Sequence, residues 1–265
     1  MKSVFLDFFK KIIHKLIIRY FHEYDIMRVA KNFKSLTVIH CPIPLTYQHD
    51  GLYTFHNCDF IKDKVFSESY KLGKSTGSWG NSDIEWRAYV ACWVADKVKG
   101  LEGDFVECGV NKGGLSRTII NYINFATLNK KFYLLDTFHG LDDKYISPVE
   151  RKNGIQAGGY EECYEQVKET FKEFNVEVIR GSVPETLNLV KAKKICYLSI
   201  DMNCVEPEIA AANYFWNMLV NGGIVLLDDY GWTNRLEQKN AFDEFANKNG
   251  LKVLPLPTGQ GLIIK

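Results

Sequence analysis

The sequence lacks long hydrophobic runs, paired cysteine motifs, internal repeats and a marked excess of charge of either sign. No apolar run approaches the roughly 20 residues that a membrane-spanning helix needs, so no transmembrane segment is expected. Charges interrupt the N-terminal apolar stretch and no small-residue cleavage site follows it, which argues against a signal peptide. The 33 Lys and Arg residues nearly balance the 32 Asp and Glu residues. A net charge of +1 gives no general field for binding nucleic acid, so nucleic acid is not an expected partner.

The seven cysteines do not have the pattern of a disulfide-rich protein. Their number is odd, no CxxC pair occurs, and several lie within apolar runs. This pattern predicts reduced thiols and therefore a cytoplasmic protein. The inner face of a membrane is the alternative location, if the N-terminal segment binds lipid.

Composition divides the chain into three parts, of which residues 1–40 are the first. Residues 1–34 hold eight Lys or Arg residues and three acidic residues, and apolar residues between Phe5 and Tyr20 recur at helical spacing. This pattern predicts an amphipathic helical N-terminal extension, with the helix over residues 3–21. Such a helix suits peripheral contact with an anionic membrane surface. We favour packing on the main domain or on a second subunit of a homo-oligomer, because amphipathic helices more often bury their apolar face in protein.

Residues 41–100 are predicted to form a connector, part of a lid, and one helix. Prolines and glycines are scattered through residues 41–82 without a clear period, which is typical of irregular structure. Asn81 or Ser82 is expected to cap a helix that continues to Lys97.

Residues 101–265 have the alternating pattern of an α/β domain. Strands are expected at 104–108, 132–135, 176–179, 195–200, 224–227, 251–254 and 262–264. Helices are expected from Gly114, near 160–174, near Leu187, near 206–220 and near 234–248. This order predicts a doubly wound, mostly parallel, seven-stranded Rossmann-like sheet with helices on both faces. The last two strands flank the turn "PTGQG" and are predicted to form an antiparallel hairpin.

The stretch "FVECGVNKGG" (105–114) has the composition of a ligand-binding turn between a strand and a helix. Glu107 and Gly109 end the strand, and Gly113 and Gly114 open a helix whose N-terminus offers free N–H groups. The next strand ends in Asp136, a position at which an acid commonly binds ribose hydroxyls. We therefore expect an adenosine-type ligand, either a dinucleotide or S-adenosylmethionine (SAM). A plain glycine-rich turn is the alternative.

The glycine spacing separates these two ligands. A dinucleotide site favours G-x-G-x-x-G, whereas this chain has E-x-G-x-x-x-G-G. An acid before the first glycine suits a ligand that carries a cationic ammonium and no pyrophosphate.

Two further strands, "YLSID" and "VLLDD", end in aspartates. If these strands are neighbours in a parallel sheet, Asp201, Asp228 and Asp229 meet at its carboxyl edge, where α/β sheets bind ligands. Three carboxylates in one pocket need a proton or a cation between them. An all-oxygen cluster favours a hard ion such as Mg²⁺. Helix or turn capping is the alternative, and it explains one of the aspartates but hardly all three.

Two other positions are weaker candidates. In "IRGSVPETL", Ser182 precedes Pro184, which is expected to begin a short helix. In a SAM site this turn would lie near the adenine. His139 is either a base or a surface histidine.

As an ordered set, "VECGVNKGG", "LLDTFHGL", "GSVPETL", "SIDMN…EPEI" and "LVNGGIVLLDDYGW" resemble the macrocin O-methyltransferase family. The resemblance covers roughly residues 75–265 and implies a class I methyltransferase fold with SAM and Mg²⁺ as cofactors. It implies metal binding by three aspartates and SAM binding along the first three strands. The implied metal ligands are Asp201, Asp228 and Asp229, and the implied SAM-site residues are Glu107, Gly109, Gly113, Gly114, Asp136, Thr137, Ser182 and Asp201.

One position departs from the family pattern. Family members often carry a second acid two residues after the first metal ligand, and here that position is Asn203. An amide cannot accept a proton as a carboxylate does. The catalytic residues are therefore sought among Asp201, His139 and Asn203, with the base left open between Asp201, His139 and a hydroxide on the metal.

The leading hypothesis is a SAM-dependent, Mg²⁺-assisted O-methyltransferase that methylates a sugar hydroxyl of a glycan or natural-product saccharide. The acceptor is expected to contact the N-terminal region and the insert at 137–158. One alternative is an NAD- or nucleotide-sugar-dependent oxidoreductase, which the missing G-x-G-x-x-G disfavours. The other is a non-catalytic homologue that binds SAM or a glycan, which Asn203 favours and the three aspartates disfavour.

Overall fold

The computed structural model describes residues 26–29, 37–40 and 44–265 of the chain. Its contacts divide the chain into two units, residues 1–58 and residues 59–265. In the described part, no helix combines the length and hydrophobicity that a membrane span requires.

The first unit contains two antiparallel hairpins. Strand β1 (Ile26–Val29) pairs with β2 (Thr37–His40), and β3 (Tyr47–His49) pairs with β4 (Leu52–Thr54). The expectation of a helical extension over residues 1–40 is therefore wrong at these strands, whose β-branched residues favour extended backbone. The helix expected at residues 3–21 lies outside the described residues, so its contact with membrane or subunit stays a prediction.

The second unit contains the remaining helices and strands. Its helices are η1 (Asp59–Lys62), α2 (Lys64–Lys74), α3 (Glu85–Val98), α4 (Gly114–Tyr122), η2 (Phe125–Thr127), η3 (Asp143–Tyr145), α5 (Pro148–Lys152), α6 (Tyr164–Phe171), η4 (Leu187–Leu189), α7 (Val205–Trp216) and α8 (Leu236–Lys248). Its strands are β5 (Asp104–Cys108), β6 (Phe132–Asp136), β7 (Gly140–Leu141), β8 (Gly158–Gly159), β9 (Val176–Arg180), β10 (Ile195–Ile200), β11 (Leu219–Leu227), β12 (Leu254–Pro255) and β13 (Gly261–Ile264).

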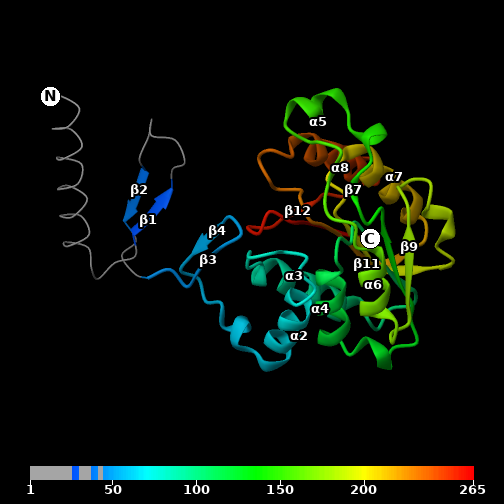
Figure 1. The fold of residues 1–265 in the computed structure, drawn as a ribbon, viewed down its shortest axis with the longest axis horizontal. Coiled ribbons are helices and arrows are strands. Elements are labelled where there is room, and N and C mark those ends of the chain that lie inside the picture. Colours follow the sequence, from blue (N-terminus) through cyan, green and yellow to red (C-terminus); the bar gives the residue numbers. More distant parts are fainter. Residues whose placement is uncertain (1–25, 30–36, 41–43) are drawn as a thin grey trace. The chain divides into compact units, whose positions relative to one another are not determined.

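Seven of these strands form one sheet in the order β12-β13-β11-β10-β5-β6-β9. Neighbouring strands from β9 to β11 are parallel, whereas β13 runs antiparallel to both β11 and β12. Helices α2, α3 and α4 lie on one side of the sheet, and α7 and α8 lie on the other (Figure 1). The predicted doubly wound sheet with a C-terminal antiparallel hairpin is confirmed.

Alternating apolar residues in the strands supply both cores of the domain. Phe105 and Phe132 belong to the buried cluster that includes α2, α3 and α4. Their chain neighbours Val106 and Tyr133 belong to the cluster that includes α7 and α8. Successive side chains of a strand point to opposite faces, so central strands that are apolar throughout bury both faces at once.

The sequence placed a boundary at residue 100, but the structure divides the chain after Cys58. Helix α2 was missed in the predicted connector: Asp63 caps it by accepting from the Phe66 N–H at 2.8 Å. Phe66 and Tyr70 are buried in the same core as the sheet. Helix α3 follows Ile84 rather than Asn81 or Ser82, because the Tyr70 hydroxyl accepts from the Ile84 N–H at 2.8 Å in place of a local cap.

Three further boundaries differ from the prediction. Helix α7 ends at Trp216 instead of continuing toward residue 220, because Leu219 already pairs with Ile195 in the sheet. The residues after Pro184 form a turn and the short 3-10 helix η4, not an α-helix that begins at the proline. Strand β12 contains only Leu254 and Pro255, which pair with Leu262 and Gly261, instead of residues 251–254.

Candidate active site

A cavity of about 250 Å³ lies at the carboxyl ends of the central strands. It spans the point where the strand order reverses, since β5 lies between β6 on one side and β10 on the other. Open α/β sheets bind their ligands at such switch points. The structure brings most of the predicted site residues into this cavity: Glu107, Gly109, Gly114, Asp136, Thr137, His139, Ser182, Asp201, Asn203 and Asp228. Gly113 and Asp229 lie outside its lining.

Gly109 allows the ends of β5 and β10 to touch. Its φ is +91°, and a Cβ atom there would lie 1.7 Å from the carbonyl oxygen of Asp201. The Asp201 N–H also donates to the Cys108 carbonyl at 2.8 Å. Only glycine combines this left-handed backbone with so close an approach. Besides its predicted role at the ligand turn, Gly109 therefore permits the contact between the ends of β5 and β10, which the sequence did not reveal.

The N-terminus of α4 is held by Ser78, a residue of the predicted connector. The Gly114 N–H donates to the Ser78 hydroxyl at 2.8 Å, and the Asn111 amide donates to the Ser78 carbonyl at 3.1 Å. Gly113 has a φ of +82° and packs against the ring of Phe171. Ser78 was missed because nothing in residues 41–82 signals a contact with a helix 36 residues later.

Asp136 hydrogen-bonds to the glycine-rich loop. Its Oδ2 accepts from the N–H groups of Val110 at 2.6 Å and Asn111 at 2.8 Å, and its Oδ1 accepts from the N–H of Phe138 at 2.7 Å. The carboxylate thus fixes the loop that follows β5. Its role as the ribose ligand stays a prediction.

Glu107 is buried in the sheet, with 2% of its surface exposed. The Ser116 hydroxyl donates to its Oε2. Burial raises the pKa of Glu107 to about 8, although the Ser116 hydrogen bond opposes that rise and the charges of Asp228 and Asp136 add to it. At neutral pH much of this side chain is therefore protonated.

This raised pKa predicts a pH-dependent stability. Between the ordinary pKa of 4.5 and the folded value of about 8, the folded protein keeps a proton that the unfolded chain has released. The contribution of Glu107 to stability is therefore complete below pH 4.5 and is lost as pH rises toward 8. Relative to wild type, Glu107→Gln should gain up to about 1.4 kcal/mol in unfolding free energy for each pH unit across this interval.

Urea denaturation at several pH values from 5 to 8 measures this effect. Glu173→Gln, at an exposed position, is the matched control and should follow wild type. If the curves of Glu107→Gln and wild type run parallel, Glu107 does not carry the expected proton.

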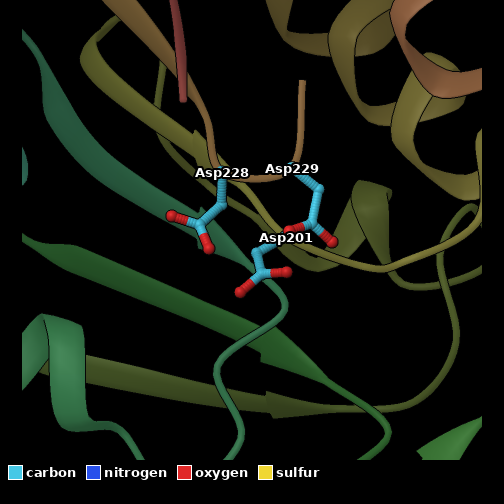
Figure 2. A group of neighbouring side chains, drawn as sticks. All are labelled: Asp201, Asp228 and Asp229. Carbon is cyan, nitrogen blue, oxygen red and sulfur yellow. The ribbon is translucent and has the colours of Figure 1, made fainter. Parts of the chain in front are cut away.

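Asp201, Asp228 and Asp229 form the predicted carboxylate cluster. Their ligand oxygens all lie within 4.8 Å of one another. Asp201 follows β10 and the other two follow β11, and the pairing of Ile200 with Leu227 makes these strand ends neighbours. Figure 2 shows the three side chains lying side by side at this edge of the sheet. Burial first, and then the charges of Asp228 and Asp229, raise the pKa of Asp201 well above its usual range.

Two arginines accompany these aspartates, and the sequence did not reveal them. Arg87 Nη1 lies 2.5 Å from Asp228 Oδ2, and Arg235 Nε lies 3.5 Å from Asp229 Oδ2. The Gln260 amide also donates to Asp228 Oδ1 at 3.1 Å. These groups offset part of the cluster's negative charge and hold the carboxylates in place. Arg87 is 141 residues from its partner, so no local motif could link them.

Asn203 has a defined orientation beside the cluster. Its Nδ2 donates to Asp201 Oδ1 at 3.2 Å, and its Oδ1 accepts from the Arg235 guanidinium. Its backbone N–H donates to Glu208 Oε1 at 2.9 Å, and its φ is +60°. Asn203 is thus a donor to Asp201 in this site, whatever group takes a proton during the reaction.

His139 lies on a different loop, just before β7. Its Nδ1 lies 2.9 Å from the Thr137 carbonyl, which acts as the acceptor when the Nδ1 carries the proton. The side chain is exposed and lines the cavity. Its catalytic role stays a prediction.

The insert between β6 and α6 covers one side of the cavity. Gly140 pairs with Gly159, and the buried Glu150 joins the insert to α7 by accepting from the Val205 N–H at 2.7 Å. Tyr160 follows this pairing, lines the cavity and remains half-exposed. Partial burial and the charges of Asp201 and Asp229 raise its pKa, which places the phenol in the electrostatic field of the carboxylates. Tyr160 was also missed from the sequence.

Residues 88–256 match the family model described as macrocin O-methyltransferase (TylF). The chain belongs to the macrocin O-methyltransferase family. As a member of this family it is a SAM-dependent O-methyltransferase. No match is found among curated protein sequences.

Solved structures support the same fold. The O-methyltransferase NovP is 19% identical with a TM-score of 0.58, over 76% of this chain and 95% of NovP. The calicheamicin methyltransferase CalS11 is 14% identical with a TM-score of 0.52, over 75% of this chain and 91% of CalS11. An O-methyltransferase from Bacillus cereus in complex with S-adenosylhomocysteine (SAH) is 11% identical with a TM-score of 0.51, over 78% of this chain and 96% of its own. At such identities these structures establish the fold alone, and the individual roles of the site residues stay predictions.

Proposed function

We propose that this macrocin O-methyltransferase homologue transfers the methyl group of SAM to a sugar hydroxyl with the assistance of Mg²⁺. The observation that carries the proposal is the carboxylate cluster, of which Asp201 and Asp228 line the same cavity as the glycine-rich turn. A methyl donor on the turn and an acceptor hydroxyl at the cluster would then meet within the same site.

The donor set of the cluster fits a hard cation. Asp201, Asp228 and Asp229 offer only oxygen ligands, which Mg²⁺ prefers. Arg87 and Asn203 orient two of these carboxylates before any ligand arrives. Mg²⁺ bound here would act as a Lewis acid that lowers the pKa of the acceptor hydroxyl. A hard cation held by these carboxylates can bind the oxygen of an acceptor hydroxyl, whereas a hydride donor has no use for it.

The acceptor is proposed to be a sugar of a glycan or natural-product saccharide. The family name and one structural neighbour support this choice: a CalS11 structure is described as TDP-rhamnose 3′-O-methyltransferase, with a TM-score of 0.50 and 15% identity. Tyr160 adds support, because its half-exposed ring offers a sugar an apolar surface on the cluster side of the cavity.

The proton of the acceptor hydroxyl needs a group other than Asn203. The amide of Asn203 donates to Asp201 Oδ1, so it cannot serve as the base. Asp201 and His139 are the side chains that we propose as candidates. The described cysteines are free thiols, which supports the proposed cytoplasmic location.

Calorimetry with SAM, SAH and NAD, each with and without Mg²⁺, tests the function directly. We expect SAM and SAH to bind and NAD to give no heat. Transfer of radiolabelled methyl to a panel of sugars that includes TDP-rhamnose should require Mg²⁺ and stop in EDTA. Binding of NAD without SAM would favour an oxidoreductase, and SAM binding without transfer to any acceptor would favour a non-catalytic homologue.

A further inference from the structure

Glu208 of α7 is a buried carboxylate beside the loop that follows β10, and the proposed chemistry does not use it. Only 3% of its surface is exposed. Its Oε1 accepts from the N–H groups of Met202 at 3.0 Å and Asn203 at 2.9 Å. The Gln238 amide of α8 donates to the same oxygen at 2.8 Å. These three donors supply the partners that a fully buried glutamate needs.

Capping of α7 does not account for these bonds. A glutamate near the start of a helix ordinarily accepts from the N–H of the N-cap residue, which is Cys204 in α7. The two N–H groups that Glu208 accepts belong to the two residues before Cys204. Glu208 therefore fixes the loop that precedes α7, and Gln238 holds Glu208 in turn. This loop forms part of the cavity wall, because Met202, Asn203 and Cys204 line the cavity.

Asn203 connects this loop to the carboxylate cluster on two sides. Its Nδ2 donates to Asp201 Oδ1 at 3.2 Å. The guanidinium of Arg235 donates to its Oδ1, and Arg235 Nη1 also lies 3.4 Å from its carbonyl oxygen. The Nε of the same guanidinium lies 3.5 Å from Asp229 Oδ2. The orientation of Asn203 therefore affects two of the three carboxylates of the cluster.

We propose that Glu208 is a positioning residue for the carboxylate cluster. Its bonds to the loop set the orientation of Asn203, and Asn203 in turn directs the carboxylate of Asp201 and the guanidinium of Arg235. Groups that orient the ligands of a metal site raise its affinity for the ion. This inference rests on the proposed cation at the cluster, and it gives a role to a carboxylate that does not itself line the cavity.

Binding of Mn²⁺ to the full chain tests the inference without turnover. Mn²⁺ takes the same carboxylate ligands as Mg²⁺, and electron paramagnetic resonance measures how much of it stays free in solution. Glu208→Asp keeps the charge but shortens the side chain by one methylene group, so its oxygen no longer reaches both N–H groups. Mn²⁺ affinity should fall about 10- to 100-fold. Glu208→Gln keeps the reach and one acceptor oxygen without the charge, and it should bind Mn²⁺ as wild type does.

Asn203→Gly tests whether the effect passes through Asn203. Glycine suits the φ of +60° and keeps the N–H that Glu208 accepts, but it lacks the amide that contacts Asp201 and Arg235. This variant should itself weaken Mn²⁺ binding. Glu208→Asp should then cause little further loss, because the two residues act in series. Glu206→Asp, at an exposed position of the same helix, is the matched control and should bind Mn²⁺ as wild type does.

Thermal melting without metal checks that each variant is folded. Wild-type affinity in Glu208→Asp would overturn the inference, and so would an equal loss with and without the side chain of Asn203. A loss in Glu208→Gln without one in Glu208→Asp would also overturn it, because the charge of Glu208 rather than its hydrogen bonds would then matter. If wild type itself binds no Mn²⁺, the proposed metal-assisted function fails, and this inference fails with it.

Discussion

Replacing Asp228 with asparagine is expected to reduce kcat/KM for methyl transfer at least ~100-fold, or about 2.7 kcal/mol of transition-state stabilisation. The physical reason is the loss of one of three carboxylates whose oxygens lie within 4.8 Å of one another. With a weaker metal site, the acceptor hydroxyl keeps its ordinary pKa. Methyl transfer from radiolabelled SAM over a range of Mg²⁺ concentrations provides the measurement. A parallel thermal melt should show that Mg²⁺ stabilises wild type and not the variant.

A second variant is needed, because Asp228→Asn also removes the ion pair between Asp228 and Arg87. Asp201→Asn leaves both arginines paired and should lose activity to a similar extent. Asp96→Asn is the matched control, since this partly exposed residue forms an ion pair with Lys99, three positions away on the surface. Full activity of both site variants in EDTA would contradict a role for a metal at this cluster.

Replacing Gly109 with alanine is expected to destabilise the folded protein by about 4 kcal/mol. The new Cβ would lie 1.7 Å from the Asp201 carbonyl oxygen, and alanine would have to adopt a φ of +91°. Strand ends β5 and β10 would have to separate, which would also move Asp201 within the cluster. The free energy of unfolding in urea measures the loss, and SAH calorimetry on the remaining folded protein measures the damage to the site.

Gly100→Ala is the control for this substitution. A Cβ atom at Gly100 meets nothing within 4 Å, and its backbone is outside the left-handed region. The stability of this variant should match wild type or exceed it by about 0.5 kcal/mol, because alanine restricts the unfolded chain. A loss of less than about 1 kcal/mol for Gly109→Ala would mean that the two strand ends can separate freely.

The sheet was predictable because its signals are local. Apolar residues in β5 and β6 pack on both faces of the sheet, and the apolar residues of the helices between the strands recur at helical spacing. The three aspartates were predictable for a related reason. Parallel strands end at a common edge, so acids at the ends of neighbouring strands must meet there. Where local signals conflicted with tertiary contacts, as at Leu219 or Ile84, the boundaries were wrong.

The sequence by itself determined the class of the fold, the family and the carboxylates at the sheet edge. Only the tertiary structure decided what surrounds them: Arg87 against Asp228, Ser78 at the start of α4, and Ser182 against Asp142. These pairs come from elements far apart in the chain, so neither periodicity nor motif spacing records them. The packing of helices and loops sets which side chains meet, and so it decides which donors surround each carboxylate.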